Sequence, residues 1–194
     1  MSPENAESRP RPEDGSHENH TDASQDTADD SDVVILEALK KLPQWVVWRY
    51  EDDLEGKPTK VLYNPAAGRK ASTTNPSTWA SYDEAKQALT TSEGRWDGIG
   101  FVFTKDDPFC GLDFDKCIKD GVLHPYVRAA VKKLDSYTEI SPSGTGLHVI
   151  VKAKLNGDRN STNDTPWGGK FEVYDHSRFF TMIGQGRAGG RDDE

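Results

Sequence analysis

The segment YTEISPSGTGLHVIV, residues 137–151, sets a long polar loop between two β-rich runs. The loop holds one proline, two glycines and three hydroxyl residues, and a histidine follows at the start of the second run. A tight antiparallel hairpin needs only two turn residues, such as Asn-Gly or Asp-Gly. The segment therefore predicts a β-hairpin whose connection is longer than turning the chain requires.

Helical and β-rich segments alternate on both sides of this hairpin. Apolar spacing predicts a helix from Asp32 to just before Pro43, a second helix over 82–89 and a third along the stripe at 127–134. The other β-rich runs are 44–50, 57–63, 99–103, 109–114 and 169–184, the last with Asp175-His176-Ser177 at its turn. We expect successive runs to pair as antiparallel hairpins. The order predicts an α+β fold with helices on one face of the strands.

The first 32 residues differ in composition from the rest of the chain. They hold ten acidic and two basic residues, and their apolar side chains are one methionine and three alanines. The remaining residues, 33–194, are nearly neutral, with 23 acidic and 22 basic side chains. Such a segment buries too little apolar surface to offset its ordering entropy, so we expect 1–32 to be a disordered acidic tail. A catalytic core over 33–187 and a polar end over 188–194 complete the predicted organisation.

The cysteines do not indicate a zinc site or a disulfide framework, and the hydropathy pattern does not indicate a membrane span. Cys110 and Cys117 lack the CxxC spacing of a zinc site and are too few for a disulfide framework. No apolar run approaches the roughly 20 residues that cross a bilayer, and the N-terminus lacks a signal-peptide core. We expect a cytoplasmic protein with no membrane partner. The sequence pI of about 5.1 does not argue against nucleic-acid binding, because the negative charge is concentrated in the tail.

The motif GLDFDKC places two carboxylates, Asp113 and Asp115, two residues apart on a predicted strand. Side chains at i and i+2 share one face of a strand, so the two acids point the same way. Carboxylate pairs suit Mg²⁺ or Mn²⁺, which take carboxylates, water and phosphates as ligands. The alternative is a solvated strand end, where Asp-x-Asp is common.

The loop in SPSGTGLHV has the composition of an anion-binding turn. Gly144 and Gly146 let the backbone approach a ligand, Ser143 adds a hydroxyl, and His148 lies on the strand that follows. The alternative is a flexible hairpin loop with a half-buried structural histidine.

A third set of candidates lies in GKFEVYDHSRFFTMIG. Glu172 projects from a strand with an apolar opposite face, and Arg178 is expected to return beside it on the partner strand. A cross-strand ion pair of little energetic value is the alternative. Asp175 is a competing acid, but its place in the turn predicts exposure to solvent.

Together these groups have complementary chemistry. Three acids suit two divalent ions, and a Gly/Ser loop with His148 and Arg178 suits a triphosphate. Phosphoryl transfer needs both halves, metals at the reacting oxygens and cations at the phosphates. Lys60 or Arg49, on the early hairpin, would add a further cation.

In this order the motifs resemble the catalytic core of the archaeo-eukaryotic primase superfamily, and in particular the primase-polymerase domains of phage and plasmid replication proteins. The resemblance covers most of 40–185 and rests on QWVVWR, YNPAAGRKASTTNPSTW, GIGFVFT, LDFDKC, SYTEISPSGTGLHVIVK and EVYDHSRFFTMIG. It implies a small N-terminal α/β module beside an RRM-like module, with the site in the cleft between them.

The resemblance also implies residue roles. Asp113, Asp115 and Glu172 would bind two Mg²⁺ or Mn²⁺ ions. His148, Ser143 with Gly144 and Gly146, Arg178 and Lys60 would lie at the phosphates of a nucleoside triphosphate. The implied reaction is template-directed DNA primer or chain synthesis on single-stranded DNA with release of pyrophosphate.

Two other readings of the sequence compete with this enzyme. A non-catalytic or truncated relative would bind nucleotide or single-stranded DNA within a replication complex. A relaxase-type initiator or nuclease would need a His-x-His pair, which the chain lacks. The chain also contains no Walker A sequence, so we expect unwinding to come from a separate helicase. Its tryptophans, among them Trp48, Trp79, Trp96 and Trp167, are expected in the core or anchoring loops rather than stacked on bases.

Overall fold

A computed structural model describes residues 30–157 and 160–183, and the side chains of 34–157 and 161–183. Residues 1–29 of the predicted tail and the predicted polar end, 188–194, lie outside the described residues. The predicted domain boundaries therefore stay predictions.

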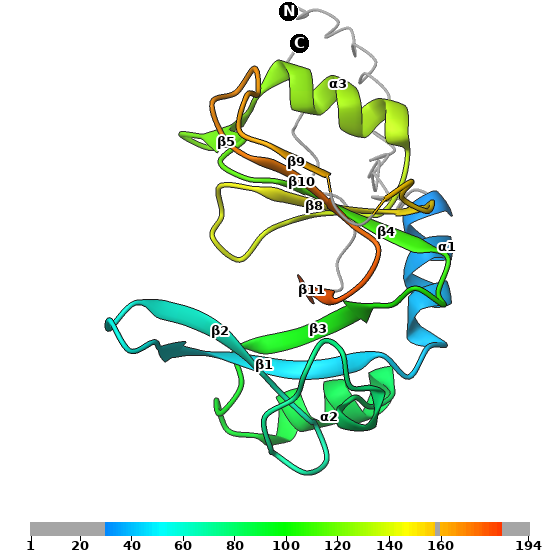
Figure 1. The fold of residues 1–194 in the computed structure, drawn as a ribbon, viewed down its shortest axis with the longest axis vertical. Helices are drawn as coiled ribbons and strands as arrows, with labels where there is room; N and C mark the ends of the chain where they lie inside the picture. Colours follow the sequence, from blue (N-terminus) through cyan, green and yellow to red (C-terminus); the bar gives the residue numbers. More distant parts are fainter. Residues whose placement is uncertain (1–29, 158–159, 184–194) are drawn as a thin grey trace, which may run out of the picture.

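The described chain forms an α+β fold of two larger antiparallel sheets, which confirms the predicted class. The sheets lie one above the other (Figure 1). The elements are α1 (Asp30–Lys40), β1 (Trp45–Asp52), β2 (Pro58–Tyr63), η1 (Pro76–Thr78), α2 (Tyr82–Thr91), β3 (Gly98–Phe103), β4 (Phe109–Phe114), β5 (Ile118–Lys119), β6 (Val122–Leu123), α3 (Pro125–Leu134), β7 (Thr138–Ile140), β8 (Leu147–Lys152), β9 (Asn160–Thr162), β10 (Phe171–Tyr174) and β11 (Arg178–Met182).

The lower sheet in Figure 1 has the strand order β11-β3-β1-β2. The first predicted hairpin is confirmed, because β1 and β2 pair antiparallel from Val47 opposite Tyr63 to Asp52 opposite Pro58. Helix α2 packs beneath this sheet through Ala85, which is fully buried. A capping box at Ser81 and Glu84 starts α2, because each side chain accepts a hydrogen bond from the other residue's backbone N–H.

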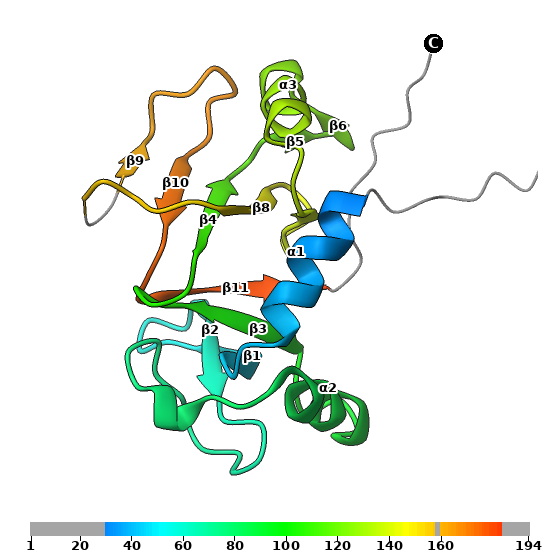
Figure 2. The ribbon, with the colours of Figure 1, turned by 90° about the vertical axis from the view of Figure 1, so that its right-hand side faces the viewer.

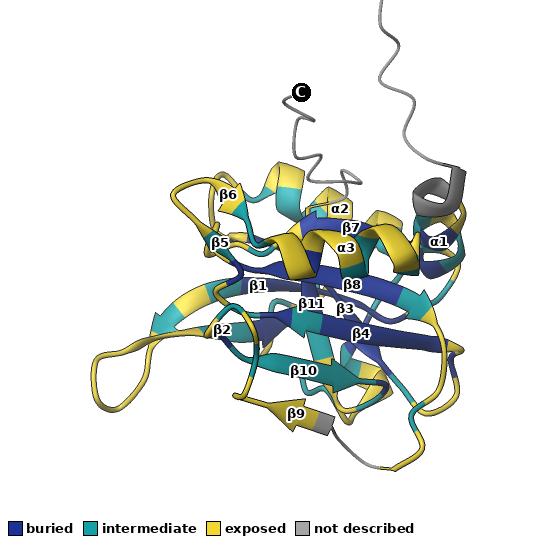
Figure 3. Ribbon diagram, turned by 90° about the horizontal axis from the view of Figure 1, so that it is seen from above, coloured by how far each residue is buried: buried dark blue, intermediate teal, exposed yellow. Residues whose placement is uncertain are grey.

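The upper sheet has the order β7-β8-β4-β10-β9. The hairpin at 137–151 is confirmed as β7 and β8. Strand β4 lies at the centre and is buried on both sides, as Figure 3 shows. Its residues Cys110, Leu112 and Phe114 pack with Val127 of α3, and the intervening residues face the lower sheet.

Two of the predicted hairpins are wrong. Strands β3 and β4 are consecutive but belong to different sheets, and so do β10 and β11. After β10 the chain crosses to the lower sheet, where β11 pairs with β3 along its edge (Figure 2). A local alternation of apolar residues identifies a strand, but it does not say which sheet supplies the partner, because that depends on contacts distant in sequence.

A buried carboxylate fixes the first of these crossings. Asp107 accepts hydrogen bonds from the backbone N–H groups of Thr104 and Phe109 at 2.8 and 2.9 Å and from Gln44 Nε2 at 2.8 Å. The chain is thereby pinned where it leaves β3 and enters β4.

Candidate active site

A row of directly opposed residues crosses the upper sheet and faces the lower one. In β4, Asp113 stands opposite His148 of β8 on one side and opposite Glu172 of β10 on the other. On the far side of His148 the next residue in the row is Glu139 of β7. Directly opposed side chains in antiparallel strands lie on the same face, about 5 Å apart at Cβ. The sheet therefore brings together four residues that the sequence separates by up to 59 positions.

The carboxyl group of Asp113 has a pKa above its ordinary value. Burial raises the pKa of its carboxyl group, and the negative charges of Asp115 and Glu172 raise it further. His148 and Lys60 act in the opposite direction. A cation between the carboxylates would relieve their repulsion, which is the usual arrangement at a divalent-metal site.

Asp115 follows the end of β4, and its backbone is held from both sides by the loop before β10. Its N–H donates to the carbonyl of Lys170 at 2.8 Å, and its carbonyl accepts from the indole N–H of Trp167 at 2.9 Å. Gly169 lies so close to the same carbonyl that a side chain would not fit there. This loop therefore sets the position of Asp115.

Glu172 is paired with a lysine that the sequence analysis did not single out. Lys170 Nζ lies 2.7 Å from Glu172 Oε1, with Lys170 two residues earlier on the same side of the strand. The i and i+2 spacing was the available signal, since it predicts a shared face. The ammonium group of Lys170 therefore lies where a metal cation bound to the Glu172 carboxylate would lie.

A cavity of about 570 Å³ lies between the two sheets and combines residues of both. Five predicted site residues line it, namely Lys60, Asp113, His148, Glu172 and Arg178. Burial lowers the pKa of Lys60, and Asp113 opposes that effect. Arg178 enters from β11 in the lower sheet, not from a strand paired with β10 as predicted. Arg49 is directed elsewhere, because it pairs with Glu51 at 2.7 Å.

The cavity also has aromatic walls that the motif search missed. Tyr50, Tyr174, Phe179 and Phe180 line it beside the charged groups. Phe180 stacks on the ring of His148, with centroids 4.2 Å apart and planes 12° apart. In the sequence these aromatic residues belong to the β-rich alternation, and that pattern does not distinguish aromatic residues of the core from those that line a site.

The predicted phosphate loop lies next to Asp115 but outside the lining of this cavity. Ser143 and Gly144 are exposed, whereas Gly146 is buried, and a Cβ at Gly146 would stand 2.9 Å from the Phe114 carbonyl. The Gly144 N–H donates within the loop, to the Ser141 carbonyl at 2.9 Å. The Ser143 hydroxyl shares hydrogen bonds with those of Ser141 and Thr145. The loop is thus internally bonded beside the end of β4.

Asp175 is not exposed, as its place in a turn had predicted. Its side chain is buried and accepts the Leu155 N–H at 3.1 Å, and it lies 2.6 Å from His176 Nδ1. These hydrogen bonds hold its pKa below the ordinary value against the opposing effect of burial, which is the largest single influence. Asp175 is buried although His176 and Ser177 are not, because it lies where the chain crosses between the two sheets.

The donor set fits divalent cations in its chemistry. Asp113 and Glu172 offer carboxylate oxygens directly opposite each other, and Asp115 influences the same carboxyl group. Among the residues that the structure describes, no three His, Cys, Asp or Glu side chains converge as ligands of one ion. Lys170 forms an ion pair with Glu172 in this structure, so the lysine side chain would have to turn away before Glu172 could bind a metal cation.

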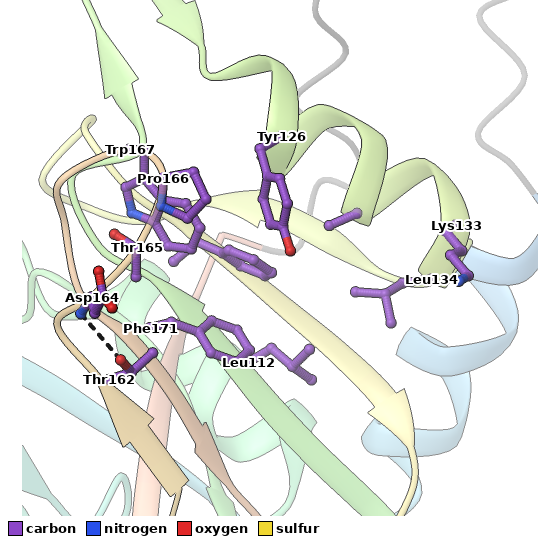
Figure 4. Close-up of a pocket in the computed structure, with 12 residues that line it drawn as sticks. Leu112, Tyr126, Lys133, Leu134, Thr162, Asp164, Thr165, Pro166, Trp167 and Phe171 are labelled. Carbon is purple, nitrogen blue, oxygen red and sulfur yellow. Dashed lines mark hydrogen bonds between the residues drawn. The ribbon is translucent and has the colours of Figure 1, made fainter.

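A second cavity, of about 540 Å³, opens on the opposite face of the upper sheet. Figure 4 shows Tyr126 of α3 and Trp167 on opposite sides of it, with Leu112 and Phe171 at its floor. Trp167 therefore lines this apolar cavity and also holds the backbone of Asp115 through its hydrogen bond to the Asp115 carbonyl. The other tryptophans named above, Trp48, Trp79 and Trp96, are buried.

Comparison with known proteins gives a relative for this site. No protein-family model matches the chain. Over 164 residues, or 84% of its length, the chain is 40% identical to a protein named DNA Primase-polymerase from the Nitratiruptor phage NrS-1. The chain is similar to a phage DNA primase-polymerase. This match confirms the resemblance drawn from the motifs. The matched stretch is 22% of the phage protein, so the chain spans about a fifth of that primase-polymerase.

No helix in the described part of the chain is long and apolar enough to span a membrane.

Proposed function

We propose that this chain carries a nucleotidyl-transfer site for template-directed DNA synthesis, with primase or polymerase activity. The observation that supports it most is the row of His148, Asp113 and Glu172 facing a cavity that Lys60 and Arg178 also line. The similarity to a phage primase-polymerase agrees with this assignment. Single-stranded DNA as template, dNTPs or NTPs as substrates, a separate helicase and a cytoplasmic place of action belong to the same proposal.

In this function the cations of the cavity bind the triphosphate. Lys60, Arg178 and His148 approach from three different strands, so they can contact different phosphate oxygens and fix the chain of phosphates in one orientation. The loop that contains Ser143, Gly144 and Gly146 would enclose the end of the triphosphate that lies beside Asp115. The aromatic wall suits the base or the sugar, because flat rings offer apolar contact without sequence preference.

The carboxylates take the reacting end of the nucleotide. Asp113, Asp115 and Glu172 would hold two Mg²⁺ or Mn²⁺ ions, which when bound stabilise charge on the attacking and leaving oxygens. The terminal or initiating 3′-hydroxyl loses its proton to solvent and its oxygen bonds to the α-phosphorus, while the bond from that phosphorus to the oxygen bridging to the β-phosphate breaks and pyrophosphate leaves. Asp113 is half-buried and lines the cavity between the sheets at this point.

The test is incorporation of labelled nucleotides on primed and unprimed single-stranded DNA with Mg²⁺ or Mn²⁺. We expect products that vanish in Asp113→Asn/Asp115→Asn and persist in Asp164→Asn, an exposed acid at the other cavity. Products without a primer would make the chain a primase. Metal-dependent nucleotide binding without synthesis would favour the non-catalytic relative, and the absence of both would contradict the proposal.

A further inference from the structure

Glu139 is a fully buried acid that the reaction described above does not use. Its side chain is 1% exposed and lies in the middle of β7, one strand beyond His148. Oxygen Oε2 accepts two hydrogen bonds, from the Tyr137 hydroxyl at 2.7 Å and from the Ile183 N–H at 2.8 Å. These two donors fix the orientation of the carboxylate.

The other oxygen of Glu139 faces the histidine of the site. Oε1 lies 3.7 Å from His148 Nδ1, slightly beyond hydrogen-bond length. Both atoms are buried, and neither has a hydrogen-bond partner among the described residues. Two buried polar atoms of complementary kind that face each other without other partners are stabilised by bonding to each other, and a small rotation closes this gap.

The ring of His148 has little other freedom. Phe180 stacks on its face at 4.2 Å, so the ring can turn only within its own plane. If Nδ1 is directed at Glu139, the nitrogen left for the cavity is Nε2, on the opposite edge of the imidazole.

We infer that Glu139 is a positioning residue for His148: it accepts a hydrogen bond from Nδ1–H and thereby directs Nε2 into the cavity between the sheets. The inference rests on the proposed function for what Nε2 then contacts, namely a nucleotide phosphate. The hydrogen bond itself does not depend on catalysis and can be measured without it.

The decisive variant is Glu139→Gln, which keeps the size of the side chain. The Ile183 N–H can only donate, so the glutamine oxygen must face it and the glutamine NH₂ group must face His148. Nδ1 then has to accept, so it carries no proton and Nε2 is the protonated nitrogen. The substitution therefore removes the proton from Nδ1 while the fold is retained.

Nitrogen NMR of ¹⁵N-histidine-labelled protein at one fixed pH measures this, with His148→Gln to assign the signal. We expect Nδ1 to be protonated in the wild type and unprotonated in Glu139→Gln, with no change in Glu55→Gln, an exposed acid at the hairpin tip. An Nδ1 signal that is the same in wild type and Glu139→Gln would overturn the inference, as would an unprotonated Nδ1 in the wild type.

Kinetics give a second readout that separates the two proposals. We expect Glu139→Ala to raise the KM for nucleotide on the order of tenfold, a size typical of coupled neighbours, and to have no further effect in a His148→Gln background. Additive losses in the double variant would contradict positioning through His148. If the wild type synthesises nothing, but Nδ1 is protonated in the wild type and unprotonated in Glu139→Gln, the proposed function is refuted and the positioning role stands.

Discussion

The side chain of Asp113 is half-buried among like charges, and its ionisation therefore opposes folding. Because burial raises its pKa in the folded protein, the penalty is present at neutral pH and disappears as the pH falls through that raised value toward the ordinary 3.8. We expect Asp113→Asn to raise the free energy of unfolding at pH 7 by about 1 kcal/mol while abolishing synthesis. Urea denaturation at pH 7 and pH 4 measures it, and the gain should shrink at the lower pH.

The stabilisation of the folded protein by a divalent cation provides a second test of Asp113. If the carboxylates bind Mn²⁺, the ion stabilises the folded wild type by mass action and raises its Tm. The same concentration should leave the Tm of Asp113→Asn almost unchanged, as scanning calorimetry would show. Equal shifts in both proteins would place the bound ion away from Asp113.

Asp107 provides a residue-scale contrast in which a buried acid supports the fold. It accepts hydrogen bonds from two backbone N–H groups and from Gln44. Removing a buried acceptor leaves those donors unsatisfied, so Asp107→Ala should lower stability by about 2–3 kcal/mol. Its exposed neighbour gives the control, and Asp106→Ala should change stability by less than about 0.5 kcal/mol in the same urea titration.

At the scale of elements, the loop between β9 and β10 links the second cavity to the active site. Trp167→Phe removes the indole N–H that reaches the Asp115 carbonyl and keeps an aromatic ring in the cavity. We expect a loss of about 1 kcal/mol in stability together with a lower rate of nucleotide incorporation, because Asp115 loses one of its two backbone restraints.

A second tryptophan is the matched control for this loop. Trp79 also donates its indole N–H to a backbone carbonyl, that of Ser72 at 2.6 Å, but it belongs to the cluster with Val46 and Leu62. Trp79→Phe should cost similar stability without a specific fall in incorporation by the folded protein. Equal kinetic losses in the two variants, measured per folded molecule, would contradict a specific role for Trp167.

At the scale of the whole molecule, a glycine of β4 lies in close contact with the lower sheet. A Cβ at Gly111 would stand 2.5 Å from Phe180 and 2.8 Å from Phe103, which belong to strands β11 and β3 of the lower sheet. Gly111→Ala therefore forces the sheets apart or displaces rings, and should cost about 2 kcal/mol in stability. Since Phe180 also stacks on His148, nucleotide binding measured by fluorescence titration should weaken as well.

A second glycine variant tests whether backbone strain alone, without a clash between the sheets, weakens nucleotide binding. Gly94, outside the candidate site, has a φ of +85° but open space around its Cβ, so Gly94→Ala should cost about 1 kcal/mol from backbone strain alone. Nucleotide binding that weakens equally in both variants would show that the contact between the sheets is not what matters.

By itself the sequence determined the class of the fold and indicated the residue types of the candidate site. Alternation of apolar residues predicted the strands, Asp-x-Asp predicted two acids on one side of β4, and the order of motifs predicted a relationship to primase-polymerases. These features are local, because side-chain period and residue type are properties of a few consecutive positions. They did not reveal Glu139 or Lys170, whose importance lies in which strand or residue they face.

Only the tertiary structure decided the partners of the strands. The sequence predicted that 99–114 and 169–184 form hairpins, whereas each crosses from one sheet to the other. Register across the upper sheet then aligned Glu139, His148, Asp113 and Glu172, and the crossing after β10 brought Arg178 to the same cavity. Strand pairing depends on burial and on contacts far apart in the chain, so no local pattern contains it.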